Sequence, residues 1–404
     1  MLNSFLDKLT SLLSKSYVIS AGFPVLIFTF VNASLLYAHH AGFRAFINTE
    51  APSSSFSALT SKVLMFVLIL VILAYILSTL QPKLRELLEG HRWYGWMGDP
   101  FRAIQKEKYD RLTKGLEDAK DAAAKSDEAR QWRKDLAKAR AEGDATNQCI
   151  SPHLTKNDAF AAIRGQRLRG EALDLTNLQT VKVDLESVLK KNSASVPDGA
   201  KLDQVSREFD DLLQYAVNRS QDEVTRLFTQ RAASFGDDDY FLPTAAGNIA
   251  RTMATYAYSR YRFNLDLLWT RLQKVMQSDS LFYPVVQDAK AQLDFAVSTF
   301  WLLIISAIIW FFIFALSGTS VTLFLLAALA LPIAAVIAYG FAVVSYHSFA
   351  DVVRASVDLY RLDLLKTLHL PRPRSADAER ALWEDVSRAL AYGELIDLRY
   401  EHPL

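Results

Sequence analysis

The sequence predicts a mainly α-helical fold: a four-helix transmembrane bundle of two hairpins, with a mostly helical cytoplasmic domain inserted between spans two and three. Three long stretches of the 404-residue chain contain no Asp, Glu, Lys or Arg: Ser16–Phe43, Val63–Pro82 and Phe295–Ala350. About 20 apolar residues allow a helix to cross the roughly 30 Å of membrane hydrocarbon. The third stretch holds two spans, because the turn residues Ser317–Ser320 interrupt it. We therefore predict spans at residues 18–38, 60–80, 296–316 and 321–346.

Lysine and arginine residues predict how these spans are oriented. Eight of them closely follow the second span: Lys83, Arg85, Arg92, Arg102, Lys106, Lys108, Arg111 and Lys114. The loop between spans one and two has only Arg44, with Lys62 at its edge, and the loop between spans three and four has none. The positive-inside rule then places both termini and residues 81–295 in the cytoplasm. We expect a multi-pass protein of the bacterial inner membrane, with the lipid bilayer as its first partner.

The predicted organisation has five parts. They are an amphipathic interfacial helix (1–16), transmembrane hairpin 1 (17–81), the cytoplasmic helical domain (82–295), transmembrane hairpin 2 (296–348) and cytoplasmic C-terminal helices (349–404). The apolar face of the first part either lies in the headgroup region or packs on the protein's own cytoplasmic domain. We interpret the first span as a membrane helix and not a signal peptide, because its apolar core is long and a second span follows.

The inserted domain begins with a charged segment, residues 101–143, that is typical of a solvated helix held by i,i+4 ion pairs. Its acids and bases are interspersed, so we expect no nucleic-acid partner. Residues 178–185 alternate in polarity and form either a strand or the start of the next helix. A loop is expected at residues 192–199, and residues 201–233 keep helical spacing. The single cysteine, Cys149, makes neither an internal disulfide nor a cysteine-rich metal site.

Beyond span four, no helix-breaking residue occurs from Asp351 to Leu370. Span four is therefore expected to continue into the cytoplasm as one helix of about fifty residues, roughly 75 Å at 1.5 Å per residue. Pro371 and Pro373 end it, and Ser375 has the position of an N-cap for a last helix. That helix presents Leu382, Trp383, Val386 and Leu390.

The stretch from Asp237 to Arg251 combines acidic residues, a small-residue turn and a helix start. Thr244 is the expected N-cap, and the small side chains around Gly247 allow another backbone or a ligand to come close. Free N–H groups there, helped by Arg251, form a candidate anion site. Asp237–Asp239 form a candidate cation site. The alternative is a capped helix after an acidic surface loop.

The helix that follows is rich in aromatic and charged residues from Tyr256 to Arg271. We expect it to be buried on more than one side, as at a junction between subunits or between domain and membrane, with arginine–aspartate pairs satisfying buried charge. The candidate coupling residues are Thr244, Gly247, Asn248, Arg251, Arg260, Asp266, Trp269 and Arg271.

These residues also carry a resemblance. Leu242-Pro243-Thr244, Gly247-Asn248, Arg251, Arg260-Tyr261, Asp266, Trp269 and Arg271-Leu272 resemble a pattern in a loose group of uncharacterised bacterial multi-pass membrane proteins. The segments Asp358–Lys366 and Leu370–Pro373 are similar to the tail of that group. The resemblance covers roughly residues 240–375 and implies spans on both sides of the aromatic helix, but no activity.

Polar and small residues within the spans are the pore or packing candidates. They are Asn32, Ser34, Ala330, Ala334, Ala338 and Ala342. The alanines recur every fourth residue and favour close helix packing, either within one subunit or between subunits. Span three is bulky, with Phe300, Trp301, Trp310, Phe311 and Phe312, and is expected to face lipid. No carboxylate or basic residue lies at mid-depth, which argues against a pump or secondary transporter.

Motifs of phosphate-binding loops, dinucleotide-binding folds, zinc proteases and serine hydrolases are absent from the sequence, so we expect no cofactor and no enzyme. An enzymatic hypothesis rests only on Asp237–Asp239 and Arg251. Our first hypothesis is a homo-oligomer that conducts ions or perturbs the membrane under control of its cytoplasmic domain, for instance in defence. The alternative is a non-conducting anchor or scaffold that recruits a soluble cytoplasmic partner.

Overall fold

The structure is a computed structural model that describes residues 15–49, 56–93, 95–142, 161, 166, 180–181, 199–236, 240–318 and 321–393. Every regular element among these residues is helical. Of the segment 178–185, only Thr180 and Val181 are described, and both are helical. The expected interfacial helix before Lys15, the cysteine Cys149 and the acidic Asp237–Asp239 lie outside the described residues.

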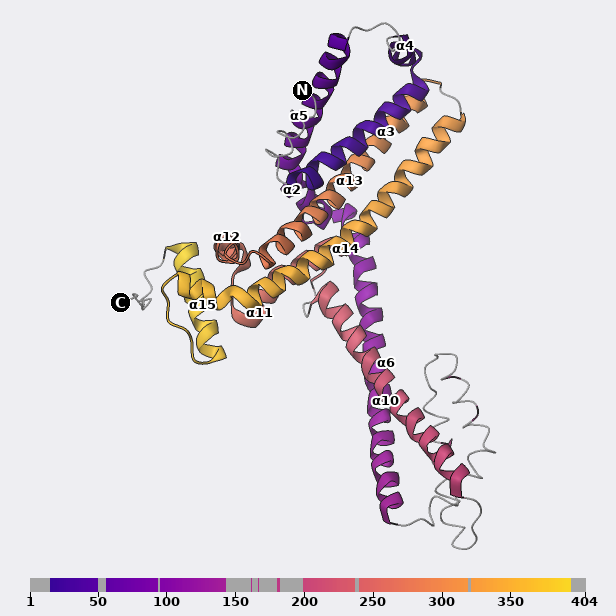
Figure 1. Ribbon diagram of the computed structural model, residues 1–404, viewed down its shortest axis with the longest axis vertical. Helices are drawn as coiled ribbons and strands as arrows, with labels where there is room; N and C mark the ends of the chain where they lie inside the picture. The colour runs from indigo at the N-terminus through magenta and orange to yellow at the C-terminus, as the bar shows by residue number, and fades with distance from the viewer. Residues whose placement is uncertain are drawn as a thin grey trace. The chain divides into compact units, whose positions relative to one another are not determined.

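Thirteen helical elements follow one another along the described chain (Figure 1). They are α2 (Lys15–Tyr17), the π-helix η1 (Val18–Gly22), α3 (Phe23–His39), α4 (Ala41–Thr49), α5 (Phe56–Glu89), the 3₁₀ helix η2 (Gly95–Met97), α6 (Asp99–Glu142), α10 (Gly199–Phe235), α11 (Ala245–Tyr261), α12 (Leu265–Met276), α13 (Phe282–Leu316), α14 (Val321–Thr367) and α15 (Ala376–Tyr392).

Four of the described helical segments are long and apolar enough to cross a membrane. They are Lys15–His39, Leu64–Glu89, Phe282–Leu316 and Val321–Thr367, and each contains one of the predicted spans or most of it. The prediction of a mainly helical chain with four candidate membrane-spanning helices is thus confirmed. Helix α13 contacts α14, α3, η1 and α5, so it occupies the centre of the bundle.

The chain divides into two compact units. One contains residues 1–106 and 233–404, and the other contains residues 107–232. Residues 233–295, which the sequence assigned to the inserted domain, therefore group with the candidate membrane helices. In the smaller unit α6 and α10 cross in the view of Figure 1, and a Cβ on Gly115 of α6 would lie 3.8 Å from Leu227 of α10. There Leu116 is buried and the Arg231 guanidinium lies 5.9 Å from the Tyr109 ring centroid.

The alanine repeat of α14 divides between two environments. Ala338 and Ala342 are buried, Ala334 is half-buried and Ala330 is exposed. Positions four apart drift by about 40° per step around a helix of 3.6 residues per turn, so a strict four-residue repeat leaves any one face. The buried face of α14 instead follows mixed steps of three and four and comprises Ala327, Leu331, Ala335, Ala338, Ala342 and Tyr346.

The expectation that the bulky side chains of α13 face lipid is wrong for three residues, Trp310, Trp301 and Phe300, the last of which is half-buried and packs against the core. Phe311 and Phe312 are exposed, as predicted. Trp310, however, is 4% exposed and packs against Phe314 with ring centroids 4.9 Å apart. Trp301 is half-buried, and its indole N–H donates to the Leu84 carbonyl at 2.9 Å. Both indoles turn inward because each finds a hydrogen-bond acceptor on a neighbouring helix.

Helix α14 continues past its apolar segment as one helix of 47 residues, which confirms the predicted extension. It ends before Pro371, at a turn where His369 has φ 56°. Ser375 caps α15, as predicted, because its side chain accepts a hydrogen bond from the Ala378 N–H at 3.2 Å. Trp383 and Val386 of α15 are buried, and the Trp383 ring meets Phe263 edge-on at 4.7 Å.

The aromatic helix does not run unbroken from Tyr256 to Arg271, contrary to the prediction. Helix α11 ends at Tyr261, where Arg262 adopts a left-handed conformation with φ 60°. Asn264 then caps α12 by accepting from the Leu267 N–H at 3.3 Å. The break divides the aromatic segment into two helices, which both pack on α14 and α15, while α11 also contacts α5 and α12 also contacts α13.

Candidate coupling site at the end of helix α5

The start of α11 is a closed hydrogen-bonded turn. Thr244 caps the helix, as predicted, because its hydroxyl accepts from the Gly247 N–H at 2.9 Å. The side chain of Asn248 is fully buried and bonds to both the N–H and the carbonyl of Leu242, each at 2.9 Å. Two of the predicted coupling residues therefore fix the path of the chain into α11.

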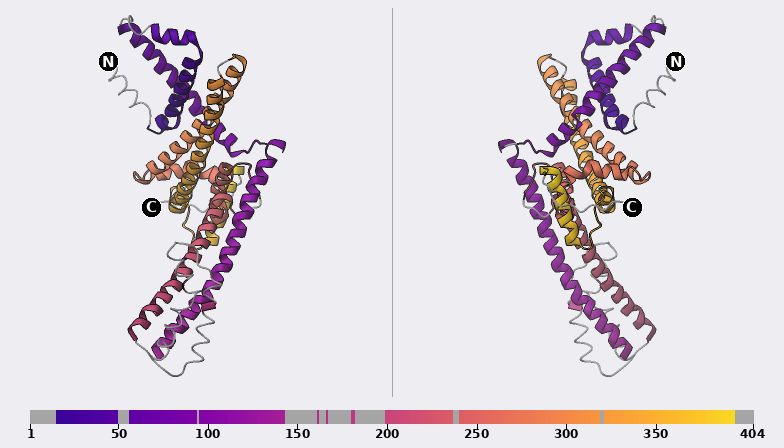
Figure 2. Two further views of the ribbon diagram at one scale, coloured as in Figure 1. Left: turned by 90° about the vertical axis from the view of Figure 1, so that its right-hand side faces the viewer. Right: turned by 90° about the vertical axis from the view of Figure 1, so that its left-hand side faces the viewer.

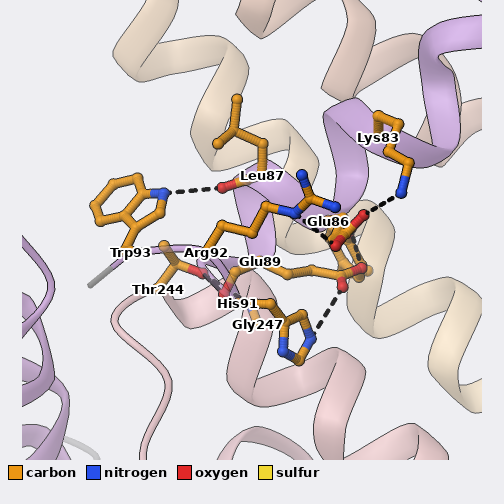
Figure 3. Close-up of polar contacts among 10 residues, drawn as sticks. Lys83, Glu86, Leu87, Glu89, His91, Arg92, Trp93, Thr244 and Gly247 are labelled. Carbon is orange, nitrogen blue, oxygen red and sulfur yellow. Dashed lines mark hydrogen bonds and ion pairs between the residues drawn. The ribbon is translucent and has the colours of Figure 1, made fainter.

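This turn lies directly against the last residue of α5 (Figure 3). The Thr244 hydroxyl donates to the Glu89 carbonyl at 3.0 Å. A Cβ on Gly247 would lie well inside 3.0 Å of that carbonyl, a separation that real Cβ atoms essentially never show. Gly90, with φ 80°, likewise has no room for a side chain because of Pro243. The two glycines thus allow two backbones to touch, and the ligand or backbone predicted near Gly247 is the backbone of α5.

The donors that the anion hypothesis requires have partners within the protein. The Ala245 N–H donates to the Tyr339 hydroxyl at 3.2 Å, and the Gly247 N–H donates to Thr244. Arg251 donates to the Phe235 carbonyl at 2.6 Å and lies 5.8 Å from the Tyr240 ring centroid. The geometry therefore favours a structural contact at this helix start over an anion site.

The carboxylate of Glu89 links α5 to α14. It accepts from the Tyr346 hydroxyl at 2.8 Å, and His91 Nε2 lies 3.3 Å from its other oxygen. One turn earlier, Glu86 pairs with Lys83 and Arg92, each at 2.9 Å (Figure 3). The end of α5 is therefore held through both its backbone and its side chains.

A buried ion cluster ties α5 to α13. The side chain of Asp294 is 2% exposed, and its two oxygens lie 3.1 Å from Lys290 Nζ and 3.2 Å from Arg85 Nε. The N–H of Arg85 Nε does not point at the Asp294 oxygen, so the two side chains form an ion pair without a hydrogen bond between these atoms. The sequence showed Asp294 only as the charge before span three and Arg85 only as one of many basic residues. Nothing in their spacing indicated that they meet.

The polar candidates of the first span have different surroundings. Asn32 is tied within the bundle: its amide donates to Ser306 Oγ at 2.9 Å and to the Phe28 carbonyl at 2.7 Å, and its oxygen accepts from the Trp310 indole at 2.7 Å. Ser34, by contrast, is exposed. Asn32 therefore links α3 to α13, and its amide group is engaged in these hydrogen bonds.

A second polar cluster forms where Asp358 of α14 accepts hydrogen bonds from two tyrosines of α11. The hydroxyls of Tyr256 and Tyr261 each donate to its carboxylate at 2.8 Å. Burial and this bond raise the pKa of Tyr261 to about 12 and also raise the pKa of Tyr256. Arg361 stacks over the Tyr261 ring at 4.0 Å and pairs with Glu379 of α15 at 2.7 Å. This cluster joins three helices.

The remaining predicted coupling residues form no arginine–aspartate pairs in the described structure. Arg260 is exposed and its guanidinium lies 5.8 Å from the Tyr256 ring centroid. Asp266 is exposed in the first turn of α12, and Arg271 donates to the Leu267 carbonyl. Trp269 packs, half-buried, against the core. The acid that the two tyrosines contact is the half-buried Asp358, which the sequence showed only as the start of the tail segment.

Comparison with known proteins adds no assignment, because no family model, no curated protein and no solved structure matches the chain. Among the described residues, no group of three or more His, Cys, Asp or Glu side chains is arranged to hold a metal ion. The site is thus defined by its contacts alone: it is a place where α5, α11, α13 and α14 are fastened together.

Proposed function

We propose that this protein is a multi-pass anchor of the bacterial inner membrane that couples a cytoplasmic helical unit, residues 107–232, to a four-helix membrane bundle. In this proposal the spans form two hairpins, both termini are cytoplasmic, and the helical unit recruits a soluble partner. One observation carries it: the two chain segments that lead to residues 107–232, which are residues 90–106 and 233–243, adjoin the contact between the end of α5 and the start of α11.

That contact gives the proposal its mechanism. One connection follows Glu89, and the other precedes Thr244, whose hydroxyl bonds to the Glu89 carbonyl. A force on the helical unit therefore reaches the bundle where α5 is fastened to α14 through Tyr346 and to α13 through Asp294. Close contacts of this kind, made by hydrogen bonds and an ion pair, transmit displacement because packed interfaces do not deform continuously.

The hydrogen bonding inside the bundle favours an anchor over a pore. Asn32 bonds to Ser306 and Trp310, and Gln81 donates to the Ser20 carbonyl at 2.8 Å. The polar groups of these side chains bond to neighbouring helices, so they are not available to line a water-filled pore. Polar side chains act in this way as links between membrane helices.

Topology is the first test, and Cys149 is a ready probe because it is the only cysteine. A membrane-impermeant maleimide should label it in inverted membrane vesicles and not in intact spheroplasts. Labelling after denaturation supplies the control for a hidden thiol. Labelling from the periplasmic side would refute the proposal.

Recruitment is the second test. Affinity purification of the full chain from crosslinked membranes should recover one stoichiometric soluble partner. The yield of that partner should fall when exposed side chains of the helical unit, such as Phe228, are replaced. An unchanged yield for every such variant would place the partner elsewhere.

A second candidate function is a homo-oligomer that conducts ions, and the outer face of α14 favours it. Ala330 and Gly340 are exposed there beside large apolar side chains, and a Cβ on Gly340 would meet nothing within 4 Å. Small residues on a lipid-facing surface let a second copy approach closely. The mass of the detergent-solubilised complex, followed by ion flux into liposomes, decides between the two functions. A monomer without flux would leave only the anchor.

A further inference from the structure

The segment between α5 and α6 presents a group of exposed apolar side chains. Trp96 is 84% exposed, Met97 is 51% exposed, and Phe101 and Ile104 are each 47% exposed. We call these four residues the aromatic turn. In the left view of Figure 2 the chain between α5 and α6 runs outward from the bundle. Exposed large apolar groups that gather in one place mark an interaction surface.

The backbone of the aromatic turn is built to hold this shape. Arg102 donates to the Trp93 carbonyl at 3.0 Å and to Asp99 at 2.6 Å. The Trp93 indole donates to the Leu87 carbonyl at 3.0 Å, and its ring meets Phe101 edge-on at 5.4 Å. A Cβ on Gly98 would lie 2.5 Å from the Trp93 carbonyl oxygen, so only glycine fits. The exposure of Trp96 is thus a feature of an ordered turn.

Contacts with α13 and α14 give the depth of this turn. Trp301 bonds to the Leu84 carbonyl and Tyr346 bonds to Glu89, so the end of α5 is level with these two residues. The charge-free stretch of α13 and α14 begins after Asp294 and ends at Ala350. The last turn of α5 therefore marks the boundary of the apolar surface, and the aromatic turn follows at once in the chain.

The charge of the segment completes the argument. Residues 90–106 contain Arg92, Arg102 and Lys106 but only one acid, Asp99, so the segment has a net charge of +2 even though Arg102 pairs with Asp99 and Arg92 pairs with Glu86 outside it. Tryptophan is favoured at the membrane–water interface, and basic side chains there are attracted to anionic lipid. We propose that the aromatic turn lies in the headgroup region of the inner leaflet and binds a surface of anionic phospholipid. The proposal goes beyond the proposed function and relies only on its membrane insertion, not on coupling or recruitment.

The experiment places an environment-sensitive fluorophore at position 96. Cys149→Ser combined with Trp96→Cys gives one labelling site, and Cys149→Ser combined with Asp118→Cys gives a control on the exposed face of α6. Each full-length labelled protein is reconstituted into vesicles of zwitterionic lipid with and without phosphatidylglycerol. Quenching is then measured with brominated lipid and with aqueous iodide.

The label at position 96 is expected to be quenched by brominated lipid and protected from iodide, and its emission should shift further to the blue when phosphatidylglycerol is present. The control label should respond to iodide. Three results would overturn the proposal: iodide quenching at position 96 equal to the control, protection from both quenchers, which indicates a protein partner or second copy, or no dependence on the anionic lipid. The maleimide and recruitment tests are read separately, so failure here leaves the proposed coupling standing.

Discussion

Replacing Gly247 with alanine tests the coupling site at its tightest point. The added methyl group would collide with the Glu89 carbonyl, and the colliding atoms belong to the backbone and cannot rotate away. The start of α11 must then move from the end of α5. We expect Gly247→Ala to weaken the junction without changing the helices themselves.

The size of the effect follows from three contributions. Overpacking of a tight contact costs about 1–3 kcal/mol, and loss of the hydrogen bond from Thr244 to Glu89 costs about 1 kcal/mol. Alanine offsets part of this by about 0.5–1 kcal/mol, because it restricts the unfolded chain more than glycine does. The net expected destabilisation is about 1–3 kcal/mol, which combines these terms.

Gly340→Ala is the matched control, because a Cβ there meets nothing within 4 Å. It should be neutral or stabilising by up to about 1 kcal/mol. Both variants are compared with the parent by thermal unfolding in one detergent and by hydrogen exchange of the last turn of α5 and the first turn of α11. If Gly247→Ala matched the parent in both measurements, the close backbone contact would be refuted.

Three further predictions concern the polar clusters. Asp294→Asn removes the carboxylate beside Arg85 and Lys290, whose side chains are 23% and 39% exposed, and should cost about 1–3 kcal/mol. Asp288→Asn, at a half-exposed pair, should cost about 1 kcal/mol or less in the same unfolding assay. The pKa of Tyr261 is about 12 in the folded protein and about 10 in the unfolded chain, so its stabilising contribution is complete below pH 10 and is lost as the pH rises toward 12. The melting temperature of Tyr261→Phe, measured against pH, should lack this alkaline loss. A profile that matches the parent would contradict the prediction. Asn32→Leu removes the hydrogen-bond acceptor of the buried Trp310 indole and should lower the free energy of unfolding by about 1–3 kcal/mol. Ion flux in liposomes should stay unchanged, and altered flux would support a pore instead.

Local signals predicted much of the helical framework. Thr244 and Ser375 act as N-caps, as expected, because capping depends on a side chain and the N–H group two or three residues later. The length of α14 followed from the absence of breaking residues up to Leu370. The four candidate spans followed from composition, since lipid requires long uncharged helices.

The missed features depend on contacts between distant residues or on unusual backbone conformations. Asp294 meets Arg85, and Asn32 meets Trp310, across helices whose rotation no sequence period fixes. The sequence pattern does not indicate the break at Arg262, because a non-glycine residue adopts positive φ there. Asn264, two residues later and just before Leu265-Asp266, is the one local sign of the new helix start.

The bond from Thr244 to Glu89 joins residues 155 positions apart, which has a consequence for biogenesis. At roughly 5–20 residues per second, a ribosome needs about 8–30 s to make the intervening chain. In the proposed topology the first hairpin is in the bilayer during that interval, and the Glu89 carbonyl at the end of its second helix has no donor because Thr244 is not yet synthesised. The first two spans therefore have to assemble before the hydrogen bond from Thr244 to Glu89 can form. A chaperone or insertase that shields the end of α5 has this interval in which to act.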